Sequence, residues 1–427
     1  MTDLATAWRA ALAAELPGAV ALRHQLHAMP QVSGAEEPTA RRVAAAILAG
    51  RAGGDGAADL ADPDGADGAD GGDGGDGGGS RSSPGRGASA VRLETIAGTG
   101  RLLRIGPDGP AVGLRAEMDG LPVAEATGAP FAAVNGAMHA CGHDVHLAAL
   151  VAVVRAARRI DLPAGLVAVL QPREEVGPTG AADVVASGRL LDLDVRSLVA
   201  AHVQPLVPAG CVTSDPGPVN ASVDEIDIVI TGRGGHGAYP HLAADPVPAL
   251  CRTVLAVPEA ARAAVDPLHP VVVTIPQLAG SGAPNVLPGV ATASGTVRAM
   301  REPDRKLVHD RIGRTVRAIA EAHGCTGEYR IRRGEPALVN DAALAGASAS
   351  WLRTFGVPSA SFASCGSDDF ATYGPQVPIL MHFVGTGEGP EGPMLHDARY
   401  LPGDGTVELT ALALLAGWLA GYGLIGS

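Results

Sequence analysis

The stretch "MHACGHDVHLAALVAVVRAARRI", residues 138–160, joins a cluster of polar side chains to an apolar segment. Apolar residues in it recur three or four positions apart, as in an amphipathic helix, at Leu147, Leu150, Val151 and Val154. Apolar runs at 111–119, 166–172 and 197–203 have the length and composition of buried strands. Strands that alternate with helices predict an α/β fold with a mostly parallel sheet and helices on both faces.

The middle of the chain follows a different pattern. "DEIDIVITGRG", residues 224–234, alternates apolar and polar residues, which indicates a half-exposed strand. A helix-like segment, two strands, a second helix and a final strand follow it, up to about residue 333. This β-α-β-β-α-β order predicts a ferredoxin-like α+β unit. We therefore expect an inserted domain at 216–333, between the two parts of the first domain at 1–215 and 334–427.

The bulk composition excludes several classes of function. The 427 residues exceed the usual size of one hydrophobic core, which indicates more than one domain. A formal net charge of −13 provides no basic surface for nucleic acid or an anionic membrane. Five scattered cysteines and a start without a basic signal region predict a cytoplasmic protein. The apolar tail, 409–427, predicts a buried terminal helix rather than a membrane span, with Thr406 as its N-cap.

Residues 52–89 consist almost entirely of Gly, Asp and Ala. Such a segment buries too little apolar surface to offset its ordering entropy, so we expect a disordered surface insertion. The alternative is a calcium-binding β-helix repeat, but the apolar residue that each such repeat needs is missing. The sequence assigns no role to this insertion.

Cys141 and His143 stand two positions apart, just before the predicted helix. A Cys-x-His pair can place a thiolate and an imidazole on one metal ion, although it lacks the spacing of a zinc finger. The alternative is a buried cysteine beside capping residues, with Asp144 as the helix N-cap. Taken alone, the motif does not decide between the two interpretations.

Glu174 and Glu175 are adjacent where a predicted strand ends. Neighbouring side chains of an extended segment point in opposite directions, so one carboxylate would bind a metal while the other faces a water. Metal-assisted hydrolysis needs this combination of a ligand and a general base. The more ordinary alternative is an exposed acidic pair in a loop.

Two further histidines follow strands, His202 at the end of one and His396 in a loop. Each alone is more simply a core or surface residue. Together with the earlier candidates they fall at the carboxyl ends of strands, where open parallel sheets bind their ligands. Five donors exceed one tetrahedral site, which favours two ions that share a ligand. Asp119, at the end of another strand, would orient a ligand histidine.

Eight motifs run in the order found in a known family of enzymes. They are "RHQLHAMPQVSGAEEPTA", "LRAEMDGLPV", "MHACGHDVH", "LQPREEVGPTGA", "GRGGHGAYPH", "PNVLPG" with "GTVRAM", "CGSDDF" and "MLHDARY". The chain resembles the aminoacylase, hippurate hydrolase and auxin-conjugate hydrolase branch of the dinuclear-metal peptidases, over nearly its whole length except 52–89. The resemblance implies a zinc-peptidase-like catalytic domain and a lid domain that forms a homodimer.

The resemblance also implies roles for individual residues. The metal ligands would be Cys141, His143, Glu175, His202 and His396, with Cys141 as the bridge between two ions. Glu174 would be the general base. His236 would stabilise the oxyanion in a partner subunit's active site, and Asn285 would lie near the substrate. Two positions depart from the family pattern: Glu117 stands where the family usually has Asp, and Asp368 where it usually has Glu. Both residues keep the negative charge but differ in side-chain length by one methylene.

We therefore expect a metal-dependent amidohydrolase that cleaves the amide of a small-molecule N-acyl amino acid. One alternative is a dipeptidase or carboxypeptidase-like enzyme of the same family. Others are a non-catalytic metal-binding relative and an interaction protein whose acidic insertion binds calcium. The set of Cys, His and carboxylate donors accommodates Zn, Mn, Co or Ni, so the sequence does not fix the metal.

Overall fold

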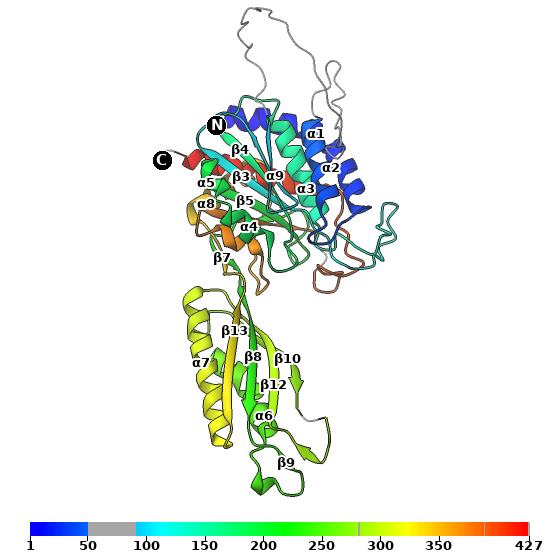
Figure 1. Ribbon diagram of the computed structural model, residues 1–427. Helices are drawn as coiled ribbons and strands as arrows, with labels where there is room; N and C mark the ends of the chain where they lie inside the picture. The colour runs from blue at the N-terminus through cyan, green and yellow to red at the C-terminus, as the bar shows by residue number, and fades with distance from the viewer. Residues whose placement is uncertain (50–90, 281, 388, 426–427) are drawn as a thin grey trace, which may run out of the picture.

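The computed structural model describes residues 1–49, 91–280, 282–387 and 389–425, so the predicted insertion at 52–89 lies outside the described residues. A larger unit is built on an eight-stranded sheet of order β1-β2-β4-β3-β5-β16-β6-β15 (Figure 1). The strands are β1 Arg92–Ile96, β2 Gly100–Ile105, β3 Ala111–Glu117, β4 Gly165–Gln171, β5 Val195–Gln204, β6 Val212–Thr213, β15 Ser359–Ala360 and β16 Ile379–Gly385. The central strands β4, β3, β5 and β16 are parallel, which confirms the predicted fold class.

Helices cover both faces of this sheet. They are α1 Thr2–His27, α2 Glu37–Leu48, α3 His143–Ala157, α4 Gly180–Ala186, α5 Arg189–Asp192, α8 Ala342–Thr354 and α9 Gly405–Leu424, with the 3-10 turn η2 Asp369–Tyr373. Residues of α1, α2, α3, α8 and α9 share one core, and residues of α4, α5 and η2 share the other. Leu166 faces the first core and Val167 the second, so β4 is apolar on both sides.

Two residues that the sequence suggested as N-caps do not cap their helices. Helix α3 begins at His143 after Gly142, which has a φ of 79° and serves as the N-cap. The Asp144 carboxylate does not cap the helix, because it accepts hydrogen bonds from Arg23 and His27 instead. Helix α9 begins at Gly405 with Asp404 as its N-cap, so the predicted Thr406 lies inside its first turn.

Helix α9 is the predicted terminal helix. Its 20 residues are long and apolar enough to cross a membrane by length and composition, but 67% of its most apolar window is buried inside the protein. Trp418 packs edge to face against Trp8 of α1, with ring centroids 4.8 Å apart. The helix therefore has the burial of a core helix.

A smaller unit carries a separate four-stranded antiparallel sheet of order β10-β12-β8-β13 (Figure 1). Its elements are β8 Ser222–Thr231, β9 Gly235–His236, η1 Pro240–Leu242, α6 Pro246–Arg262, β10 Val271–Ala279, β11 Val286–Leu287, β12 Val290–Ala299, α7 Glu302–Ala322 and β13 Thr326–Arg333. Helices α6 and α7 pack on one face around their own core. The chain enters after β7 Gly217–Asn220 and leaves before β14 Leu338–Asn340, and these two strands pair with each other.

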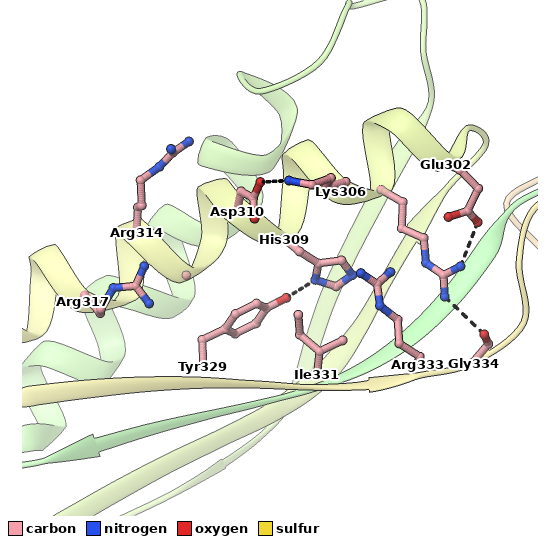
Figure 2. Close-up of a pocket in the computed structure, with 12 residues that line it drawn as sticks. Glu302, Lys306, His309, Asp310, Arg314, Arg317, Tyr329, Ile331, Arg333 and Gly334 are labelled. Carbon is pink, nitrogen blue, oxygen red and sulfur yellow. Dashed lines mark hydrogen bonds and ion pairs between the residues drawn. The ribbon is translucent and has the colours of Figure 1, made fainter.

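A buried ion-pair network holds α7 to the base of the smaller unit. The Asp224 carboxylate on β8 accepts two hydrogen bonds from Arg305, at 2.5 and 2.7 Å, and one of 2.6 Å from His309. In Figure 2 the hydroxyl of Tyr329 points to His309, at 2.5 Å from its Nδ1. Although burial favours the neutral acid, the bonds from Arg305 and His309 lower the pKa of Asp224.

Replacement of Asp224 by alanine tests this network. The change leaves a buried guanidinium without its carboxylate, so we expect a loss of about 3–5 kcal/mol in the free energy of unfolding. The exposed Glu302 binds the same arginine, and Glu302→Gln should cost less than about 1 kcal/mol. Urea unfolding of both variants measures the difference. Equal stability of the two variants would contradict the assigned role.

Candidate active site

Four separate segments of the larger unit converge at the carboxyl end of its sheet. Cys141 directly precedes α3, His143 is the first residue of α3, and Glu175 lies in the loop after β4. One ligand atom from each of these three residues lies within 4.8 Å of the other two. The spatial grouping that the strand ends predicted is therefore present.

The other two predicted ligands lie at the same place. The Nε2 atom of His202, near the end of β5, is 3.4 Å from the Sγ atom of Cys141. The Nε2 atom of His396, in the loop after β16, is 3.4 Å from Oε1 of Glu175. His202 and His396 line one cleft of about 470 Å³ together with Cys141, Glu174 and Glu175.

Two donor atoms of this cluster have no hydrogen-bond partner among the described residues. They are Nε2 of His143 and Oε1 of Glu175, and both are buried. A buried polar atom without a partner costs free energy, so such atoms indicate a missing ligand. A thiolate, imidazole nitrogens and a carboxylate oxygen form a donor set that suits Zn²⁺ and related ions. The residues present therefore fit the implied metal site.

The electrostatics of the cluster also favour a bound cation. Burial raises the pKa of Cys141 well above its usual range, and the charges of Glu175 and Glu174 raise it further. Burial alone would lower the pKa of His143, but Asp119 and the nearby carboxylates raise it to about 10. Without a bound metal, the protein thus favours a neutral Cys141 thiol and a protonated His143 imidazole. A bound cation reverses both preferences, because ligands must be deprotonated.

Asp119 positions two of the predicted ligands without lining the cleft. Its backbone oxygen accepts a 2.8 Å hydrogen bond from Nδ1 of His143, which leaves Nε2 free to face the cluster. Its carboxylate accepts the Glu175 N–H at 3.0 Å and the Ser33 hydroxyl at 2.7 Å. These bonds fix both the ring of His143 and the loop that carries Glu175.

Glu174 does not point away from Glu175, as an extended segment would require. The chain bends here after Arg173, which has a φ of 51°, and both carboxylates approach Nε2 of His143 to 3.9 Å. The predicted opposite orientation is therefore wrong. Burial and the charges of Asp368 and Glu175 raise the pKa of Glu174 well above its usual range, although Arg115 lowers it.

The two departures from the family pattern occupy different places. Glu117 is buried beneath the cluster, where it pairs with Arg115 and accepts a 3.0 Å hydrogen bond from Nδ1 of His146. Asp368 lines the cleft and lies 3.4 Å from the same arginine. The extra methylene of Glu117 therefore affects the support of the site, whereas the shorter Asp368 changes the wall of the cleft.

His236 and Asn285 are not part of this cleft within one chain. Strand β9, which carries His236, pairs with β11 at the end of the smaller unit remote from the larger unit (Figure 1). The backbone oxygen of Asn285 accepts a 2.9 Å hydrogen bond from Gly237, so the two loops lie together. Both side chains are exposed.

Arg298, at the end of β12, is a site residue that the sequence analysis missed. Among the described residues that line the cleft, it is the only lysine or arginine. Its Nη1 atom donates a 3.0 Å hydrogen bond to the backbone oxygen of Cys365, across the boundary between the units. The motif "GTVRAM" contains it, but no spacing in the sequence indicated that the lid sheet contributes a cation to the cleft.

A model of peptidase family M20/M25/M40 matches residues 113–415 of the chain. The chain belongs to this family. It is 32% identical to the N-acetylcysteine deacetylase of Bacillus subtilis, over 65% of the chain and 74% of that protein. It is also 32% identical to the N-acetyldiaminopimelate deacetylase of Shouchella clausii, over 71% of the chain and 81% of that protein.

Solved structures share the fold. A protein of methicillin-resistant Staphylococcus aureus, described as an aminohydrolase, superposes with a TM-score of 0.81 at 25% identity, over 96% of the chain and 98% of that protein. A dinuclear metal-binding peptidase of the M20 family from Bacillus subtilis superposes with a TM-score of 0.77 at 24% identity, over 97% of the chain and 99% of that protein. The prediction that the chain is an amidohydrolase is confirmed, while the hippurate and auxin-conjugate branch stays a prediction.

The positioning role of Asp119 in this M20 protein can be measured through metal binding. Asp119→Ala removes the carboxylate that holds the Glu175 loop, so we expect metal affinity to fall about 10–100-fold. Titration of the metal-free protein with Zn²⁺ in a competing chelator gives the affinity. Asp183→Asn, an exposed change on the nearby α4, serves as the control and should leave the affinity unchanged. Unaltered binding in Asp119→Ala would refute the role.

Proposed function

We propose that this protein removes the acyl group from N-acyl amino acids by hydrolysis of their amide bond, with two divalent metal ions. The observation that carries the proposal is the convergence of Cys141, His143, Glu175, His202 and His396 beside the half-buried Glu174. Bound divalent ions polarise a substrate carbonyl and lower the pKa of water. Zn, Mn, Co and Ni all suit this donor set, and Cys141 is our choice for a shared ligand.

In this proposal Glu174 moves the proton. A carboxylate whose pKa is raised is a stronger base than an ordinary glutamate, so it can accept a proton from the attacking water. The same carboxyl group then donates the proton to the leaving amine. Its neighbour Glu175 is assigned to the metal instead, because its Oε1 atom lies near both His143 and His396.

The cleft also favours a substrate with a free carboxylate. Arg298 faces it from the smaller unit and can form a charge-assisted, bidentate pair with the α-carboxylate of the amino acid. The deacetylases from Bacillus subtilis and Shouchella clausii are named for N-acetylated amino acids, which supports an acetyl group over a benzoyl group. An assay of N-acetyl amino acids, hippurate and dipeptides would separate our proposal from the dipeptidase alternative.

We further propose a cytoplasmic homodimer that places His236 in the cleft of the second copy. The exposed tip that carries His236 also exposes apolar side chains, with 56% of Tyr239, 65% of Leu242 and 49% of Val286 accessible. Such a surface is typical of an interface. The sheet edge β10 supports the same assembly, because it is apolar, whereas the opposite edge β13 is protected by arginines. The imidazole of His236 would stabilise the oxyanion.

Glu174→Gln tests the general base. The amide keeps the shape of the side chain but cannot accept the proton, so turnover should fall by about 10²–10⁴-fold or more. Metal content, measured by mass spectrometry, should stay at the wild-type level, because Glu174 is not one of the proposed ligands. Normal turnover in this variant would refute the assignment of the base.

Mixed dimers test whether His236 acts across subunits. His236→Ala and Glu174→Gln should each be inactive alone, since every site lacks one group. Co-refolding of the two variants should restore part of the activity, because one site in a mixed dimer receives Glu174 and His236 from different chains. Sedimentation measures the dimer in each sample. Dimers that form but restore no activity would contradict the shared site.

A further inference from the structure

The cleft has one acidic group that the proposed chemistry does not use and that no described cation holds. Its lining includes the cluster residues, Glu174, and the buried pair Asp368 and Asp369, which are held by Arg115. Glu335 also lines the cleft and is half-buried. Its carboxylate makes no hydrogen bond or ion pair with any described residue. A carboxylate in this position loses part of its hydration and gains no partner in return.

The backbone of Val223 lies between Glu335 on one side and Arg298 on the other. Val223 of β8 pairs with Arg298 on β12, and its N–H donates a 3.1 Å hydrogen bond to the backbone oxygen of Glu335. The two charged residues therefore stand two strand spacings apart, which is roughly 10 Å between their backbones. The wall of the cleft thus presents a cation and an anion at a fixed separation.

The position of Glu335 is also rigid. The preceding Gly334 donates its N–H to the Val223 oxygen at 3.1 Å, and its own oxygen accepts a 3.2 Å hydrogen bond from Arg305. Arg305 in turn is fixed by the buried Asp224. These bonds hold the backbone at Glu335 in place, so less entropy is lost when a ligand binds its side chain.

We propose that Glu335 makes this enzyme selective for N-acyl amino acids whose side chain carries a cation. The inference rests on the proposed function and deepens it. Arg298 binds the α-carboxylate, and Glu335 binds the side-chain ammonium several carbon atoms away. The charge-assisted hydrogen bond that results supplies the partner that Glu335 lacks among the described residues. Diamino acids acylated on the α-amine therefore form the substrate class.

The test compares two substrates that differ by one amino group. The metal-loaded enzyme is assayed with N-α-acetyl-L-lysine and with N-α-acetyl-L-norleucine, which has the same carbon chain. We expect a higher kcat/KM for the lysine derivative. Glu335→Gln should lower that value on the order of tenfold or more and leave the norleucine value unchanged. Activity on norleucine also shows that the variant is folded.

Two further variants sharpen the result. Glu335→Lys should reverse the preference and favour N-acetyl-L-2-aminoadipate, whose side chain is anionic. Glu328→Gln is the matched control, because this residue lies on the exposed edge strand of the same unit, where it pairs with Arg330. Glu328→Gln should leave kcat/KM unchanged for both substrates. If Glu335→Gln lowers kcat/KM equally for both substrates, Glu335 only supports the connection between the units. The proposed selectivity is then wrong.

Binding of the free amino acids separates this inference from the proposed function. Calorimetry with L-lysine and L-norleucine needs no turnover, so it reports on Glu335 even if neither acetyl derivative is hydrolysed. Tighter binding of lysine that is lost in Glu335→Gln supports the selectivity. Absence of hydrolysis of every N-acyl substrate would overturn the proposed function alone. Equal binding of the two amino acids would overturn the inference alone.

Discussion

The site depends on the burial of donors that cannot satisfy one another. Cys141, His143 and Glu175 are brought within a few ångströms by two segments, and two of their atoms have no hydrogen bond with any residue that the structure describes. Such an arrangement is unfavourable in the protein alone, because burial opposes a thiolate and a carboxylate without a countercharge. Metal binding and folding are therefore coupled, and the convergence of these segments makes physical sense only around a cation.

The polar groups around the cluster hold the segments that carry the candidate ligands in place. His146 donates to Glu117 and accepts the N–H of Val203, so it fixes the backbone next to His202. Asp144 binds Arg23 of α1 and therefore fixes the start of α3, where His143 lies. These networks explain why His146 and Asp144, which are not among the proposed ligands, lie in the same short motif as Cys141 and His143. Each of the two orients a ligand through the backbone or the adjacent residue.

Much of the fold was predictable because burial leaves a periodic pattern in the sequence. The strands β4 and β5 place apolar residues in both cores, β3 is buried along its whole length, and α3 repeats with the period of a helix. The carboxyl ends of these strands then located the candidate ligands without any contact information. Local geometry was less predictable. The bend after Arg173 and the ion pairs of Asp144 depend on segments distant in sequence, so neither the direction of Glu174 nor the true cap of α3 was visible.

The missed residues, Arg298 and Glu335, share one property: they lie where the smaller unit joins the larger one. Arg298 ends β12 and Glu335 follows β13, so both leave the lid sheet where its strands reach the larger unit. A sequence pattern identifies β12 and β13 as strands, but it does not say which of their ends meets the metal cleft. That information comes from the pairing of β7 with β14, which fixes where the inserted unit joins the larger one. The catalytic groups and the recognition groups of the cleft therefore belong to different units, so a shift between the units would alter substrate binding while the metal donors keep their geometry.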